Sequence, residues 1–269
     1  MKRTLMLLLA LSPLSTMAGT LTVKGSDTMV VLAQRWAEEF MKKNAGAKVQ
    51  VTGGGSGTGI AALINGTTDL ATASRQMKEA ESEKLRGRYS TPGTEIAVAK
   101  DGVTFYVSEK NPVTSLTMDQ LKKIYVGDIT NWKEVGGPDA PIVVFSRENS
   151  SGTYVFVKDT LLGGDDYLAS AQTLPGTAAV VNAVAKEKFG IGYGGAAYAK
   201  GVKELKVKVG NDELAPTLEN VKSGKYPLSR DLYFYLKGKP SGDAKAFIDF
   251  CLSAEGQAVV TRVGYFPVK

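Results

Sequence analysis

The stretch GGGSGTGIAALIN, at residues 53–65, follows the short strand-like run VQV at residues 49–51. A second stretch, RENSSGTYVFV at residues 147–157, follows a similar apolar run at residues 142–145. Each stretch has the order strand, Gly/Ser/Thr turn, helix start. The first N–H groups of a helix lack internal partners and carry partial positive charge, and glycine lets that backbone approach a ligand closely. The two turns therefore predict one oxyanion held between two halves of the molecule.

Elsewhere the chain repeats the order strand, turn, helix. Within residues 29–43, the apolar residues Leu32, Trp36 and Phe40 recur every four positions, which is typical of an amphipathic helix. Alternation of strands and helices predicts an α/β fold, with helices packed on a largely parallel sheet. In such sheets a ligand binds at the carboxyl ends of the strands, which is where both turns lie.

The N-terminus has the features of a secretory signal peptide. Met1–Arg3 is basic, residues 5–14 are apolar, and Thr16 and Ala18 are the small residues expected before a cleavage site. We expect a signal peptide at residues 1–18, cleavage before Gly19, and a periplasmic protein. A membrane anchor is the alternative, but a span needs about twenty apolar residues.

Composition excludes several classes of chemistry. The chain has no histidine and a single cysteine, Cys251, which falls in one amphipathic helix expected over residues 241–263. Without histidine, a Ser-His-Asp triad and a histidine-ligated metal site are both excluded, so we expect no metal and no cofactor. The formal charge is +6, but the lysines are scattered and no basic run indicates binding to nucleic acid.

The two turns differ from familiar phosphate loops. A P-loop requires a lysine where Ile60 stands, so that motif is excluded. Arg147 precedes Ser151 by four residues, and a guanidinium placed there can be aimed at an anion held by the amides of the helix start. Asp27 and Glu148 are the acids nearest the turns, and by default they complement helix N-termini. A flexible glycine loop and a solvated arginine are the alternatives.

Six segments of the chain are specific in combination. They are GSDT at 25–28, TGGGSGTG at 52–59, ASR at 73–75, DITNWKEVGG at 128–137, RENSSGT at 147–153 and FGIGY at 189–193. In this order they resemble the periplasmic phosphate-binding proteins of ABC transporters, and the likeness covers essentially the whole chain after residue 18. The family implies a two-lobe periplasmic binding protein fold of type II, with two α/β lobes joined by two crossing strands around a ligand cleft. We place lobe one at residues 19–100 plus 231–269, and lobe two at residues 101–230.

The resemblance also implies which residues contact the ion. We assign as contacts Ser26, Thr28, Met29, Ser56, Arg75, Arg147, Ser151, Gly152 and Thr153. At one position the chain departs from the longer family members, which have an aspartate after the serine that aligns with Ser74 and use it to accept the proton of hydrogen phosphate. Here that position is Arg75, a residue that many shorter relatives share. A fixed acceptor rejects sulfate, which has no proton, so we expect another acceptor, with Asp27 the first candidate and Glu148 the second.

The resemblance implies an exported receptor that captures inorganic phosphate and delivers it to an ABC permease, without making or breaking a bond. We expect a monomer. The same fold with sulfate, molybdate or tungstate as ligand is an alternative, because Arg75 would strengthen binding to any dianion. A secreted phosphatase-like hydrolase with Ser56 or Ser151 as nucleophile is another, although no histidine is present to activate either serine. A role in adhesion or phosphate sensing is a further alternative.

Overall fold

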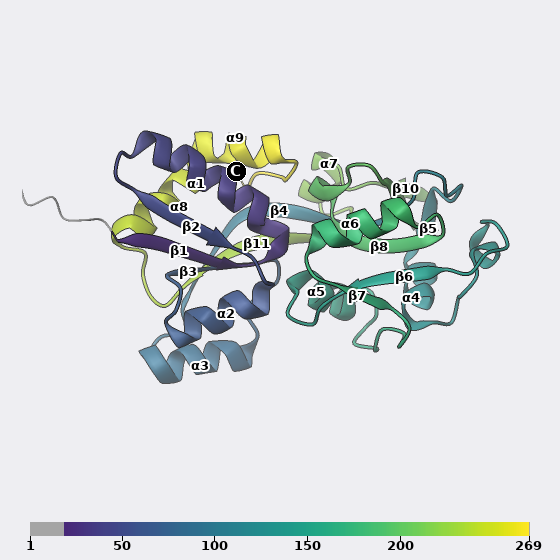
Figure 1. Ribbon diagram of the computed structural model, residues 1–269, viewed down its shortest axis with the longest axis horizontal. Helices are drawn as coiled ribbons and strands as arrows, with labels where there is room; N and C mark the ends of the chain where they lie inside the picture. Colours follow the sequence, from purple (N-terminus) through teal and green to yellow (C-terminus); the bar gives the residue numbers. More distant parts are fainter. Residues whose placement is uncertain (1–18, 269) are drawn as a thin grey trace, which may run out of the picture.

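The computed structural model describes residues 19–268, and it consists of two α/β lobes side by side (Figure 1). The signal peptide predicted at residues 1–18 lies outside the described residues. Two long strands pass from one lobe to the other, and the sheet is continuous through them. The fold is therefore α/β, as the sequence pattern predicts, and it has the two lobes of a periplasmic binding protein, as the family resemblance implies.

Lobe one is built on a mixed sheet. Its strands, in spatial order, are β2 (Lys48–Thr52), β1 (Thr20–Gly25), β3 (Leu70–Ala73), β11 (Ser229–Leu236) and the first part of β4 (Thr94–Val107). The first three strands are parallel, and β11 is antiparallel to both β3 and β4. One face carries α1 (Val30–Lys43), α8 (Gly242–Leu252) and α9 (Ala254–Val263), and the other carries α2 (Ser56–Asn65) and α3 (Glu79–Tyr89) (Figure 1).

Lobe two continues the sheet from the second part of β4. Its strands are β8 (Gly190–Gly195), β6 (Val143–Arg147) and β7 (Gln172–Leu174), with β9 (Lys203–Val209), β5 (Ser115–Thr117) and β10 (Asp212–Leu214) on the other side of β4. The helices are α4 (Met118–Val126), α5 (Gly152–Thr160), α6 (Thr177–Lys186) and α7 (Leu218–Lys222). Three short 3₁₀ turns complete the described chain: η1 (Asp27–Met29), η2 (Trp132–Val135) and η3 (Ala196–Tyr198).

The crossing strands exchange partners between the lobes. Strand β4 pairs with β11 as far as Gly102, opposite Ser229, and from Val103 onward it pairs with β8. Each lobe has its own buried aromatic core. In lobe one Trp36 packs edge-on against Phe234, and in lobe two Phe105 packs against Tyr125 and Tyr193. Because each lobe has its own core, the contacts between the lobes do not have to hold either lobe together.

The C-terminal helix differs from the sequence-based expectation. The single helix expected over residues 241–263 is two helices, which separate at Ser253. The hydroxyl of Ser253 accepts the Gly256 N–H at 3.2 Å and starts α9. A Cβ on Gly256 would lie 2.1 Å from the Phe250 carbonyl, so glycine is required where the two helices turn against each other. The amphipathic period continues through the break, which is why the pattern alone did not reveal it.

Candidate functional site

The glycine turn of lobe one begins α2 earlier than the sequence suggests. The turn-then-helix order of residues 53–65 places the helix after the last glycine, from Ile60, but the helix begins at Ser56, so the turn itself supplies the free N–H groups. Gly54 and Gly55 have φ of 110° and 93°, a region that glycine adopts without strain. The Ser56 hydroxyl is fully buried and accepts the Ser74 N–H at 3.0 Å, which ties the turn to the end of β3.

The serine turn of lobe two is closed by its own side chain. Ser151 caps α5, and its hydroxyl accepts the N–H groups of Thr153 and Tyr154, both at 3.2 Å. Upstream, strand β6 delivers Arg147, whose N–H donates to the Tyr193 hydroxyl at 3.3 Å. This hydroxyl also bonds Ser146 Oγ at 3.0 Å. These bonds fix the position of the Arg147 backbone at the end of β6, close to the Ser151 cap of α5.

The two turns meet across the cleft. Gly57 N–H, in the first turn of α2, donates to the Ser150 carbonyl at 2.9 Å. The hydroxyls of Thr28 and Thr153 lie 2.9 Å apart. We call the buried groups of Thr28, Ser56, Arg147, Ser151, Gly152 and Thr153 the cradle.

Three further assigned residues surround the cradle. Ser26, which follows β1, and Met29, the last residue of η1, are both buried, and Ser26 Oγ has no hydrogen-bond partner among the described residues. Arg75, by contrast, directs its fork at Glu81 of α3, with N–O distances of 2.8 and 2.7 Å. Burial would raise the pKa of Glu81, but hydrogen bonds from Arg75 and the Lys78 amide outweigh it and lower that pKa. The Arg75 charge is therefore balanced within lobe one.

Arg147 is the cation of the cradle and is 2% exposed. Its Nη2 donates to Asp27 Oδ2 at 2.8 Å across the cleft, and its Nη1 donates to Thr177 Oγ1 at 2.9 Å. Its Nε is buried without a partner among the described residues. Burial lowers the pKa of Arg147 and Asp27 opposes that effect, but an arginine so paired stays protonated at neutral pH. The guanidinium can therefore donate to an anion as well as to Asp27.

The two candidate proton acceptors lie in different surroundings. Asp27 is half-buried, and its Oδ1 accepts the Gly54 N–H at 2.8 Å while its Oδ2 accepts Arg147. Tyr198 donates to the Asp27 carbonyl at 2.8 Å. Burial first, and then Asp27, raise the pKa of Tyr198 to about 12, so it remains a donor at neutral pH. Glu148 is exposed. Of the two acids, only Asp27 is joined to both turns.

Sequence reasoning missed four residues beside the cradle. Thr177 is the first residue of α6, whose N-cap is Gly176, and the Thr177 hydroxyl accepts a hydrogen bond from Arg147 Nη1. Ser74 bonds Ser56, and Asp101 pairs with Arg230 on the crossing strands. The sequence contains a usable signal for Asp101 and Arg230, because each is a charged residue beside the run of apolar residues in its own strand.

The described residues contain no group of three or more His, Cys, Asp or Glu side chains placed to hold a metal ion. Across residues 19–268, no helix is both long and apolar enough to cross a bilayer.

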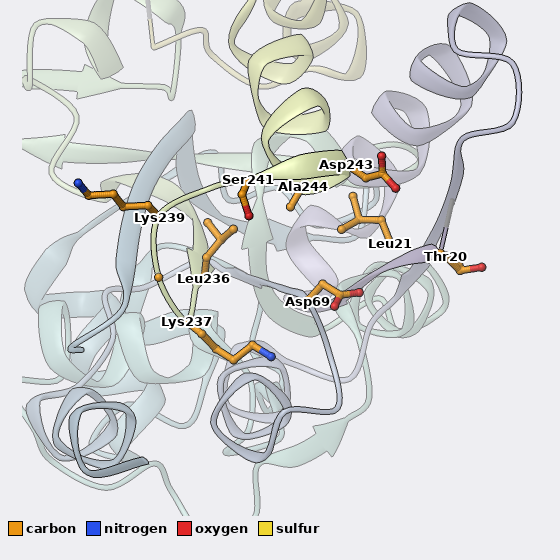
Figure 2. Close-up of a pocket in the computed structure, with 11 residues that line it drawn as sticks. Thr20, Leu21, Asp69, Leu236, Lys237, Lys239, Ser241, Asp243 and Ala244 are labelled. Carbon is orange, nitrogen blue, oxygen red and sulfur yellow. The ribbon is translucent and has the colours of Figure 1, made fainter. Parts of the chain in front are cut away.

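A separate surface pocket of about 350 Å³ lies in lobe one (Figure 2). It is lined by Thr20 and Leu21 at the start of β1, by Asp69 just before β3, and by Lys237 and Ser241 after β11. The cradle lies at the opposite, carboxyl ends of these parallel strands. The pocket therefore belongs to a different edge of the sheet from the cradle.

Comparison with known proteins identifies the family. The family model described as PBP superfamily domain matches residues 12–255. The phosphate-binding protein PstS of Pseudomonas aeruginosa is 33% identical over 273 residues, covering 94% of this chain and 84% of the relative. The chain belongs to the PstS family. PstS of Bacillus subtilis is 34% identical over 253 residues, covering 93% of this chain and 81% of that protein.

A solved structure extends the PstS likeness to the fold. It is the crystal structure of a protein from Clostridium perfringens, named as a phosphate ABC transporter substrate-binding protein and solved with bound phosphate. It matches with a TM-score of 0.86 and 32% identity, covering 93% of this chain and all of the other. Both lobes of the PstS fold are therefore present here.

Proposed function

We propose that this chain is an exported receptor that captures inorganic phosphate in the cradle and delivers it to an ABC permease. The observation that carries the proposal is the meeting of two helix N-termini beside buried Arg147, with hydroxyls from both lobes. Amides at helix starts, hydroxyls and one guanidinium can replace the hydration shell of a tetrahedral oxyanion. The names of the PstS relatives and the phosphate bound in the Clostridium perfringens protein support this ligand.

The energetics are sufficient for a transport receptor. Micromolar binding requires only about −8 kcal/mol net. A hydrogen bond to a charged group contributes about 1.5–3 kcal/mol, so the donors of the cradle supply this after desolvation and lobe closure are subtracted. Closure is a rigid-body motion of two lobes around the crossing strands, because the ion touches both lobes. The receptor acts as a monomer.

No group in this mechanism performs covalent chemistry, and the PstS family consists of transport receptors. Ser56 is occupied as the acceptor of the Ser74 N–H, and Ser151 as the cap of α5. A hydrolase that uses either serine as nucleophile is therefore not favoured. Export rests on the signal peptide predicted at residues 1–18.

Preference for phosphate over sulfate rests on Asp27. A carboxylate offers about four lone-pair positions, and Gly54 and Arg147 use two of those on Asp27. The remaining positions accept the proton of hydrogen phosphate, whereas sulfate brings no proton and would face the carboxylate with an unpaired like charge. Arg75, paired with Glu81, is not needed for this discrimination.

Calorimetric titration tests both parts. The protein is unfolded to remove carried-over ligand, refolded, and titrated with phosphate and with sulfate. We expect tight one-to-one phosphate binding that excess sulfate does not displace. Asp27→Asn should narrow the preference for phosphate by about 10-fold or more, the effect of one charge-assisted hydrogen bond. The exposed Glu148→Gln is the matched control and should leave the preference unchanged.

The outcomes separate the alternatives. Equal or tighter sulfate binding by the wild-type protein would replace phosphate with a general dianion as the ligand. An unchanged preference in Asp27→Asn would remove Asp27 from the role of acceptor, and a changed preference in Glu148→Gln would assign it there.

A further inference from the structure

A buried ion pair sits where the two strands cross between the lobes. Arg230 of β11 and Asp101 of β4 are register partners, and both Nε and Nη2 of Arg230 donate to Asp101 Oδ2, at 3.0 and 2.7 Å. The two side chains are only 4% and 1% exposed. An arginine held by two donors on one carboxylate has a fixed orientation, so its other donors point in defined directions.

Those remaining donors reach one group in each lobe. Nη1 donates to the Ser74 carbonyl in lobe one at 3.0 Å, and Nη2 donates to Thr153 Oγ1 in lobe two at 3.0 Å. The guanidinium carbon also lies 5.2 Å from the centre of the Phe156 ring on α5. Arg230 therefore connects the crossing strands to both sides of the cradle.

Arg230 limits where the Thr153 proton can go. A guanidinium has no acceptor, so Thr153 Oγ1 must accept at that contact. The hydroxyls of Thr28 and Thr153 then hold two protons between them, and one is used in the 2.9 Å bond that joins them. Whichever threonine donates in that bond, the other keeps a proton that cannot turn toward Arg230. That proton is available to an ion in the cradle.

We propose that Arg230 is a positioning residue for the phosphate site, acting through Thr153. Anchored by Asp101, it holds Thr153 Oγ1 as an acceptor and polarises the Thr28–Thr153 hydroxyl pair, so that the pair keeps one proton for a hydrogen bond to the bound phosphate. The inference rests on the proposed phosphate function. Arg230 is not needed as a direct ligand of the ion.

A double-mutant cycle tests the coupling. Phosphate dissociation constants are measured by calorimetry for wild type, Arg230→Met, Thr153→Val and the double variant. We expect Arg230→Met alone to weaken phosphate binding about 10-fold, and by less than about 2-fold when Val replaces Thr153, since interacting residues are not additive. An equal weakening in both backgrounds would overturn the proposal, because Arg230 would then act independently of the hydroxyl pair.

A conservative variant keeps the test usable if Arg230→Met fails to fold. Arg230→Lys retains the charge but lacks the fork that reaches Asp101 and Thr153 together. It should bind phosphate less tightly than wild type, and the difference should again disappear in the Thr153→Val background. If the Arg230→Lys variant binds phosphate as tightly as the wild-type protein, the guanidinium fork has no positioning role and the proposal is wrong.

Two further measurements isolate the mechanism. Arg262→Met removes an arginine paired with Glu39 on the exposed face of lobe one, and it should leave the phosphate dissociation constant unchanged. Small-angle scattering with saturating phosphate should give Arg230→Met the same radius of gyration as wild type. A variant that fails to close would make Arg230 a hinge residue instead. If the wild-type protein itself does not bind phosphate, the proposed phosphate function is wrong, and this failure is distinct from a failure of the role proposed for Arg230.

Discussion

The glycine turn of lobe one and the serine turn of lobe two both begin a helix at the cradle, the proposed phosphate site, but they are completed in different ways. The serine turn caps its own helix, because the Ser151 hydroxyl accepts the N–H groups of Thr153 and Tyr154 within the same lobe. The glycine turn has no side-chain cap, and its Gly57 N–H finds an acceptor in the other lobe, at Ser150. One turn is completed by contacts within its own lobe, while the other is completed by a contact from the opposite lobe.

This difference assigns distinct tasks to the two lobes. A self-capped turn loses little freedom when it binds an ion, so lobe two is suited to make the first contact. The open glycine turn then adds its amides and its bond to Ser150 only on closure. The hydrogen bond of the lobe-one turn to Ser150 therefore depends on closure of the lobes. Variants that keep the two turns apart should weaken phosphate binding more than they lower the stability of the protein.

The largest effect is expected from Gly152→Ala. A Cβ at Gly152 would lie 2.3 Å from Ser56 Oγ and 2.6 Å from Ser74 Oγ, both in the opposite lobe. Alanine suits a helix start, so the separate lobes should keep their stability while closure is blocked. We expect phosphate affinity to fall by more than about 100-fold, or about 2.7 kcal/mol, in a calorimetric titration.

Gly57→Ala is the matched control on the other turn. Its Cβ would meet the Ser150 carbonyl at 3.3 Å and Arg75 Nη2 at 3.8 Å, contacts that a small shift relieves. It should weaken binding far less than Gly152→Ala. If Gly57→Ala and Gly152→Ala lowered phosphate affinity equally, the two turns would contribute alike, which would contradict the difference described between them.

Ser151→Ala should have an intermediate effect, and it targets the self-capped turn. Loss of an N-cap hydroxyl destabilises a protein by about 1 kcal/mol, which lowers the melting temperature of a chain this size by about 2–4 °C. Phosphate binding should weaken as well, since the turn is no longer preformed. Thermal unfolding without phosphate and calorimetry with it measure the two effects.

Thr117→Ala removes a cap of the same kind from α4, where Thr117 accepts the Gln120 N–H at 3.1 Å. It should lower stability similarly and leave phosphate binding intact. If Ser151→Ala lowers stability but not affinity, preformation of the serine turn has no bearing on capture.

The smallest effect concerns Glu81, which holds Arg75 beside the glycine turn. Because the pKa of Glu81 is lowered in the folded protein, its stabilisation is present above the unfolded pKa of about 4.3 and is lost as pH falls through the folded value. Glu81→Gln should therefore reduce stability by about 1 kcal/mol or less at pH 7. Urea unfolding between pH 3 and 7 should show the difference from wild type vanishing in the acid range; a constant difference would contradict it.

Much of the fold was predictable because it depends on local chemistry. The period of Leu32, Trp36 and Phe40 fixes the buried face of α1, and all three residues are buried. The start of α2 was misplaced because glycine-rich sequence reads as loop, although the Gly55 backbone is what allows Ser56 to begin the helix. The break at Ser253 was missed because the apolar period continues across it.

The sequence by itself predicted the two Gly/Ser/Thr turns at helix starts and excluded histidine chemistry, since these depend on residue types and short-range geometry, and the two-lobe fold was implied by the family resemblance. Only the tertiary structure decided the partners of the arginines. Arg75 pairs with Glu81, six residues along the chain, and Arg147 pairs with Asp27 of the other lobe. Arg230 pairs with Asp101 on the neighbouring strand. A guanidinium bonds whichever acceptor the folded chain brings within about 3 Å, and that choice depends on contacts far apart in sequence.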